Sequence, residues 1–218
     1  MSDRLSRFAP LTGVLFAVIV IVAVFTSNGE SPKADARPAK VISYYTSHGS
    51  EVETSAILFA LAFVVVVLFG ASLRSYMRRS VASEGAAAIV LAGAVLMAAG
   101  ALTGSGVEYG LAHNLTRLEP SAAQALNVLQ NEMFLPVIGG AFLFGLGSGL
   151  AILRGAALPR WLGWVAIVIG VAALVPPASF PALLAFVIWS VVVSILMYLR
   201  TGPAASVPAA GGPVPVAG

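Results

Sequence analysis

The sequence predicts an all-α membrane protein, a six-helix transmembrane bundle with both termini in the cytoplasm. Three observations lead to this prediction. Of the 218 residues, 59% are hydrophobic and only 10% are charged, whereas a soluble domain carries about 25% charged residues. The apolar residues are gathered into segments of roughly 20 residues, the length of a transmembrane helix. The basic residues recur at the ends of these segments, where membrane orientation places them.

Each of the six segments is continuously apolar, without the alternation of a barrel strand, and is therefore predicted to be a helix. The predicted spans are residues 8–26, 55–73, 85–107, 134–153, 161–178 and 180–199. They form a single transmembrane domain over residues 1–200. Residues 201–218 are rich in Pro, Ala and Gly and lack periodicity, which predicts a disordered cytoplasmic tail.

The first segment could instead be a signal peptide, because Arg4 and Arg7 precede its apolar core. The best small-x-small cleavage site, Ala34-Asp35-Ala36, lies well beyond the end of that core. We therefore interpret the segment as an uncleaved first span.

The distribution of charge predicts the orientation. Eight of the twelve basic residues fall in one set of connecting segments, together with only two of the nine acids. The alternate segments hold four basic residues and seven acids. Basic residues of short loops stay in the cytoplasm, so the acidic segments are predicted to face outward. The predicted location is the inner (plasma) membrane.

Several function classes are excluded or disfavoured by composition. The absence of cysteine excludes disulfides, thiolate metal sites and cysteine nucleophiles. The basic residues form no single patch, so no nucleic-acid partner is predicted and the expected partner is the lipid bilayer. No span carries a charged, histidine or amide side chain near its middle, which disfavours a proton- or ion-coupled transporter.

Two stretches resemble a known family. The segment YYTSHGSEVETSAILFALAFVVVVLFGASLRSYMRR and the later segment LRGAALPRWLGWVAIVIGV are similar to multi-pass membrane proteins of unknown function from high-GC bacteria. The Tyr-Tyr…His motif, the Leu-Pro-Arg-Trp-Leu-Gly-Trp turn and the order of the spans carry the likeness. The resemblance implies the architecture and implies no reaction.

Glycines spaced four residues apart occur in the third and fourth spans, at Gly100, Gly104, Gly145 and Gly149. This spacing makes a flat strip on which another helix can pack closely. The strip could form a homo-oligomer, or it could pack within one bundle.

A polar cluster is predicted at the outer end. The second helix can begin near Pro38, which would place Tyr44 and His48 on one face at i and i+4. Tyr109 and His113 repeat this spacing after the third span. Histidine and carboxylate together suit zinc or copper, and two histidines could ligate haem. The candidate metal ligands are His48, His113, Glu108 and Glu132.

The same residues could instead be solvated helix ends at the membrane surface, since Tyr and His are common at membrane interfaces and no HxxH or HExxH motif is present.

Between the third and fourth spans, Pro120 and Ser121 can open a further helix. Its stripe of Leu126, Leu129 and Met133 could lie on the membrane, cap the bundle as a lid or extend the fourth span.

Three functions therefore remain open. The first is a non-catalytic membrane protein that binds a small ligand, a lipid or a partner at its polar outer end. The second is a metal- or haem-dependent membrane enzyme that uses His48 and His113. The third is an oligomeric channel or uncoupled carrier. No catalytic residue or cofactor is assigned by the sequence.

Overall fold

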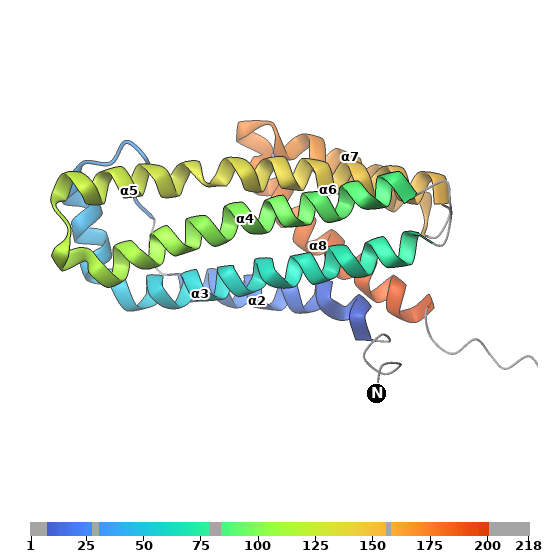
Figure 1. Cartoon of the computed structure of the whole chain (residues 1–218), viewed down its shortest axis with the longest axis horizontal. Coiled ribbons are helices and arrows are strands. Elements are labelled where there is room, and N and C mark those ends of the chain that lie inside the picture. Colours follow the sequence, from blue (N-terminus) through green and yellow to red (C-terminus); the bar gives the residue numbers. More distant parts are fainter. Residues whose placement is uncertain (1–7, 28–30, 79–83, 156–157, 201–218) are drawn as a thin grey trace, which may run out of the picture.

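The computed structural model describes residues 8–27, 31–78, 84–155 and 158–200, and all secondary structure in these ranges is helical (Figure 1). The all-α prediction is confirmed. The predicted tail, residues 201–218, lies outside the described residues. The elements in chain order are η1 (Ala9–Leu11), α2 (Thr12–Thr26), α3 (Pro38–Met77), α4 (Glu84–Asn114), η3 (Leu115–Arg117), α5 (Pro120–Glu132), α6 (Phe134–Gly155), α7 (Arg160–Ala173) and α8 (Pro176–Arg200).

Five helical segments are long and apolar enough to cross a bilayer, which suggests a multi-pass membrane protein. These segments are Ala9–Thr26, Pro38–Met77, Glu84–Arg117, Pro120–Gly155 and Pro176–Arg200. Helix α7 is apolar but has only 14 residues. At 1.5 Å per residue it is about 21 Å long, whereas the hydrocarbon layer is about 30 Å thick. The fifth predicted span is therefore not confirmed.

The boundary between the last two helices differs from the prediction, which placed it between residues 178 and 180. The chain turns at Leu174 and Val175, and α8 already begins at Pro176. Proline is favoured in the first turn of a helix because its missing N–H needs no partner there. The Ser179 hydroxyl donates to the carbonyl oxygens of Ala173 at 2.9 Å and Val175 at 3.0 Å and so fixes the turn.

Helices α3 and α4 and the consecutive pair α5–α6 run along the long axis of the molecule (Figure 1), and α4 packs between α3 and α6. We call the end formed by α5, the first part of α3 and the last part of α4 the α5 end. Helices α3, α6 and α8 finish at the opposite end, where α7 begins (Figure 1). These helix ends carry the arginines Arg74, Arg78, Arg154, Arg160 and Arg200.

Close helix packing depends on glycine. A Cβ atom added to Gly93 of α4 would lie 2.8 Å from the carbonyl oxygen of Gly140 in α6, and the reverse distance is 2.7 Å. Such distances are shorter than any real Cβ contact, so the two backbones meet only because both residues lack a side chain.

The four glycines of the predicted strip all face neighbours within the chain. Gly100 and Gly104 contact Met133, at the junction of α5 and α6. Gly145 and Gly149 face α7, where added Cβ atoms would lie 2.5 Å from the Ala166 oxygen and 2.6 Å from the Gly163 oxygen. These contacts support packing within one bundle. Homo-oligomerisation through the same glycines stays a prediction.

The α5 end has its own small core, built from Val41, Tyr45, Val52, Leu111 and Ala123 with their neighbours. Helix α5 packs against this core and continues into α6 as one helical segment, Pro120–Gly155, as the helix-extension interpretation predicted. Its buried face, however, is not the predicted leucine stripe, because Leu129 is exposed while Asn127 is fully buried.

Three amide side chains of α5 bind residues 31–37, which we call the strap segment. Gln124 Nε2 donates to the carbonyl oxygen of Ala36 at 3.2 Å, Asn127 Nδ2 to that of Lys33 at 3.0 Å and Asn131 Nδ2 to that of Pro32 at 3.3 Å. These bonds satisfy backbone groups of an irregular segment, which would otherwise be costly to bury.

Candidate functional site

His48 lies at a kink in α3, where its backbone departs from helical geometry with φ of −122° and ψ of 15°. Its Nδ1–H donates to the carbonyl oxygen of Tyr44 at 3.1 Å. The imidazole also stacks on the Tyr44 ring, with centroids 5.0 Å apart. The predicted pairing of Tyr44 with His48 is confirmed, and it is a local contact within one helix.

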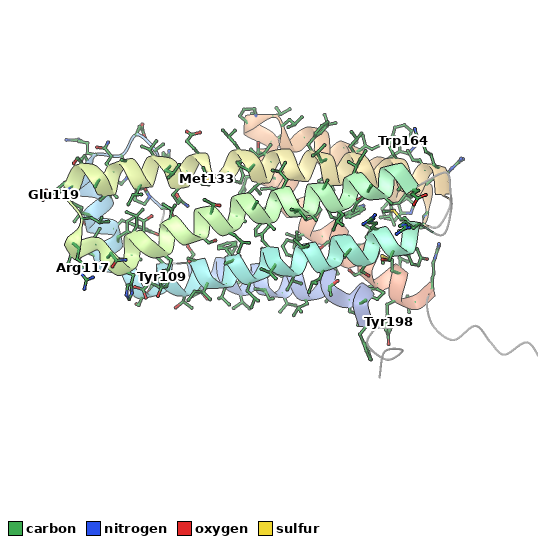
Figure 2. All side chains as sticks on the ribbon, viewed as in Figure 1. Tyr109, Arg117, Glu119, Met133, Trp164 and Tyr198 are labelled. Carbon is green, nitrogen blue, oxygen red and sulfur yellow. The ribbon has the colours of Figure 1, made fainter. Side chains whose placement is uncertain are left out.

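His113, near the end of α4, bonds a different partner. Its Nδ1 lies 3.2 Å from Oε1 of Glu53 in α3. Its ring stacks on that of Tyr109 with centroids 5.5 Å apart, which confirms the second predicted pair. Figure 2 shows Tyr109 and Arg117 toward the same end of the molecule. His113 is largely exposed, so its link to Glu53 is a surface interaction of small energetic value.

The other two predicted metal ligands lie elsewhere. The Glu132 side chain is exposed, whereas that of Glu108 lines a cavity between the helices. Among the described residues, no group of three or more His, Asp or Glu side chains lies close enough together to hold a metal ion. The structure therefore does not bring His48, His113, Glu108 and Glu132 together, and a metal centre built from them stays a prediction without geometric support.

The cavity has a volume of about 540 Å³ and lies among α2, α3, α4, α6 and α8. Its inner walls are apolar, with Phe16, Phe63, Met97 and Phe186 among the lining residues. Small residues of α4, such as Ala101 and Gly104, leave the space between the helices unfilled. The sequence signal for the cavity was this small-residue face, which we had interpreted only as a packing surface.

An aromatic cluster supports the inner wall. Phe186 contacts the rings of Phe16 and Phe144, with centroids 6.0 and 5.1 Å apart, and stacks on Trp189 at 6.3 Å. The indole Nε1–H of Trp189 donates to the carbonyl oxygen of Leu162 at 3.1 Å. Interlocked rings with a satisfied indole make a rigid wall, so the cavity is built into the fold.

Polar groups gather where the cavity approaches the α5 end. They are Ser27, Ser31, Ser55, Ser105, Glu108, Gln130 and Asn131. No described residue donates a hydrogen bond to Glu108 or forms an ion pair with it. Figure 2 shows Met133, which also lines the cavity, between this end and the middle of the molecule.

The rim of the cavity includes side chains on the outer surface of the bundle. Val24 of α2, Phe134 of α6 and Leu184 of α8 line the cavity and are also exposed, and Phe180 of α8 is 68% exposed. These side chains face the medium that surrounds the helices, which in a membrane is lipid. The cavity is therefore open to that medium at its rim.

The described lining contains one carboxylate with hydroxyl and amide groups, and it contains no histidine and no basic residue. Apolar walls with a few polar groups are typical of sites that bind small molecules. Comparison of the chain with models of known protein families, with curated proteins and with solved structures found no match. The resemblance noted from the sequence therefore stays a prediction.

Proposed function

We propose that the protein is a multi-pass membrane protein that binds an amphipathic small molecule, lipid-like in shape, within this cavity. The observation that carries the proposal is an apolar cavity of about 540 Å³ with its polar groups gathered at one end. Ligand sites in proteins have volumes of about 300–1,000 Å³ and combine apolar walls with a few polar groups. The two-part lining matches a molecule with an apolar tail and a polar head.

The energetics favour recognition of the head. A tail that leaves the bilayer for the cavity moves between two apolar surroundings, so the hydrophobic effect supplies little of its affinity. The tail contributes dispersion contacts with the aromatic wall of Phe16 and Phe186. Discrimination between ligands then rests on the hydrogen-bonding groups around Glu108.

The orientation that we propose places the α5 end outside and both termini in the cytoplasm of the plasma membrane. It rests on the arginines at the opposite end and on the retention of basic loops inside. In this orientation the cavity lies in the outer part of the bundle. A ligand could then exchange with the outer leaflet through the exposed rim of the cavity.

Photolabelling tests the proposed binding. The full chain in nanodiscs is irradiated with a diazirine-bearing dodecanol, and the labelled peptides are identified by mass spectrometry. We expect saturable labelling of residues that line the cavity. Ala101→Phe fills the cavity and should reduce this labelling, whereas Ala92→Phe, at an exposed site on the same helix, should leave it unchanged. Labelling spread over the lipid-facing surface and insensitive to Ala101→Phe would refute the proposal.

A further inference from the structure

We infer that the cavity selects an amphiphile with a positively charged, hydrogen-bond-donating head group, such as a primary ammonium. This inference rests on the proposed function and deepens it, because it names the chemical class of the ligand. It is carried by three groups at the polar end of the cavity, Ser55, Glu108 and Asn131.

Glu108 supplies the charge. It is the only ionisable side chain in the described lining, and it is half-buried. A carboxyl group in a partly apolar cavity is costly to ionise unless a cation or hydrogen-bond donors stabilise the carboxylate. The described residues provide neither an ion pair nor a hydrogen bond to Glu108. A cationic ligand would supply the missing partner.

Asn131 adds an acceptor. Its Nδ2 group donates to the carbonyl oxygen of Pro32 at 3.3 Å and to that of Asn127 at 2.8 Å. An amide nitrogen has two hydrogens, and both are used in these bonds. What Asn131 retains for a ligand is its carbonyl oxygen. Because both partners are themselves acceptors, the side chain cannot be turned round without losing both bonds.

The hydroxyl group of Ser55 likewise uses its hydrogen in a bond within the protein. Its hydroxyl hydrogen is donated to the carbonyl oxygen of Val52 at 3.1 Å, and its side chain is buried. A hydroxyl that donates its one hydrogen keeps two lone pairs. Ser55 therefore also presents an acceptor to the cavity.

Ser55, Asn131 and Glu108 thus offer acceptors and negative charge, and the head group that complements these three residues has donors and positive charge. A primary ammonium carries three N–H donors and no acceptor. An alcohol carries one donor without charge, and a fatty-acid carboxylate would be repelled by Glu108. The expected order of affinity is ammonium, then alcohol, then carboxylate.

The test compares dodecylamine, dodecanol and dodecanoate, which share one chain and differ in the head group. Binding of each to the full chain is measured by native mass spectrometry from a non-ionic detergent. We expect dodecylamine to bind at least about tenfold more tightly than dodecanol, as hydrogen bonds to charged groups imply. Glu108→Gln should abolish this preference.

A matched control distinguishes the effect of the Glu108 charge from that of the other negative charges at the α5 end. Glu132→Gln removes the same charge from an exposed neighbour that does not line the cavity, and it should leave the tenfold preference intact. Equal binding of amine and alcohol, or a preference that survives Glu108→Gln, would overturn the inference while leaving the cavity a binding site. Failure of all three compounds to bind would instead count against the proposed function itself.

Discussion

At the scale of the residue, Asn131 shows how one side chain serves both the fold and the candidate site. Its nitrogen ties the strap segment to α5 through the bond to Pro32, and its oxygen is left for the cavity. The strap segment in turn holds Ser31 at the polar end of the same cavity. The hydrogen bonds that build the α5 end therefore also determine which groups a ligand would meet.

The two histidines are expected to act independently. His48 bonds Tyr44 within α3, whereas His113 bonds Glu53. Substitutions of residues that are neither in contact nor joined through a shared partner, and that lie more than about 7–10 Å apart, add to within about 0.3–0.5 kcal/mol. In thermal unfolding of the full chain, the effects of His48→Ala and His113→Ala should therefore sum in the double variant. The pair His113→Ala and Glu53→Gln, which share a contact, is the comparison expected to deviate from additivity. A coupling between the two histidines well above 0.5 kcal/mol, with bound metal, would restore the shared metal site.

The sequence predicted the local side-chain pairs, but it also predicted a cluster of His48, His113, Glu108 and Glu132 that the described residues do not form. Tyr44 with His48 and Tyr109 with His113 follow from helix spacing alone, and both pairs are present. Whether two helices turn their histidines toward each other depends on the rotation of each helix about its axis. The kink at His48 changes that rotation locally, and no periodicity in the sequence encodes it.

At the scale of the element, the small residues of α4 have two roles: they allow close packing on α6, and they line the cavity. Gly93 brings its backbone against α6, while Ala101, Gly104 and Ser105, further along, line the cavity. Where the opposing helix presents a small residue, the backbones meet. Where the opposing chains diverge, the same small residues leave a space that they cannot fill.

Gly149 tests the close packing of α6 against α7. A larger side chain there would meet the Gly163 oxygen and Ile167, and overpacking of this kind costs about 1–3 kcal/mol. Gly149→Leu should therefore lower the Tm of the detergent-solubilised protein. Gly106→Leu is the control, because a Cβ at Gly106 meets nothing within 4 Å, and its Tm should stay unchanged or rise slightly with helix propensity. Equal melting of Gly149→Leu and the parent would contradict the packing of α6 on α7.

The start of α3 at Pro38 and of α5 at Pro120 could be predicted, because proline in the first turn marks where a helix begins. The boundary between α7 and α8 could not. The predicted spans placed Pro176 and Pro177 at the end of the fifth span, residues 161–178, but they open α8. Proline pairs occur both between helices and in the first turn of a helix, and the bonds of Ser179 that fix this boundary exist only in the folded chain.

At the scale of the whole molecule, the helices separate charge along the long axis. The ends of α3, α6 and α8 and the start of α7 carry arginines at one end, and Glu51, Glu53, Glu108, Glu119 and Glu132 belong to segments at the α5 end (Figure 1). The fold class and this polarity could be predicted because they follow from composition and from the order of the spans. The number of complete crossings could not, because α7 is apolar after Arg160 and yet has only 14 residues.

Cysteine labelling tests the orientation, and the chain needs no prior removal of native cysteine. Ser50→Cys and Ser121→Cys, at exposed sites of the α5 end, should react with an impermeant maleimide in intact cells. Glu84→Cys, exposed at the opposite end, should react only after the cells are permeabilised. The reverse pattern would place the acidic end and the mouth of the cavity on the cytoplasmic side.

The most direct measurement of the central claim, that the cavity holds an amphiphile by its head, is a crystal structure of the full chain grown with 12-bromododecylamine. We predict electron density for the amine beside Glu108 and an anomalous bromine peak near Phe16 and Phe186 at the inner wall. The Glu108→Gln variant, grown identically, should show a weaker peak. A cavity without ligand density, with bromine found only on the lipid-facing surface of the bundle, would contradict the account.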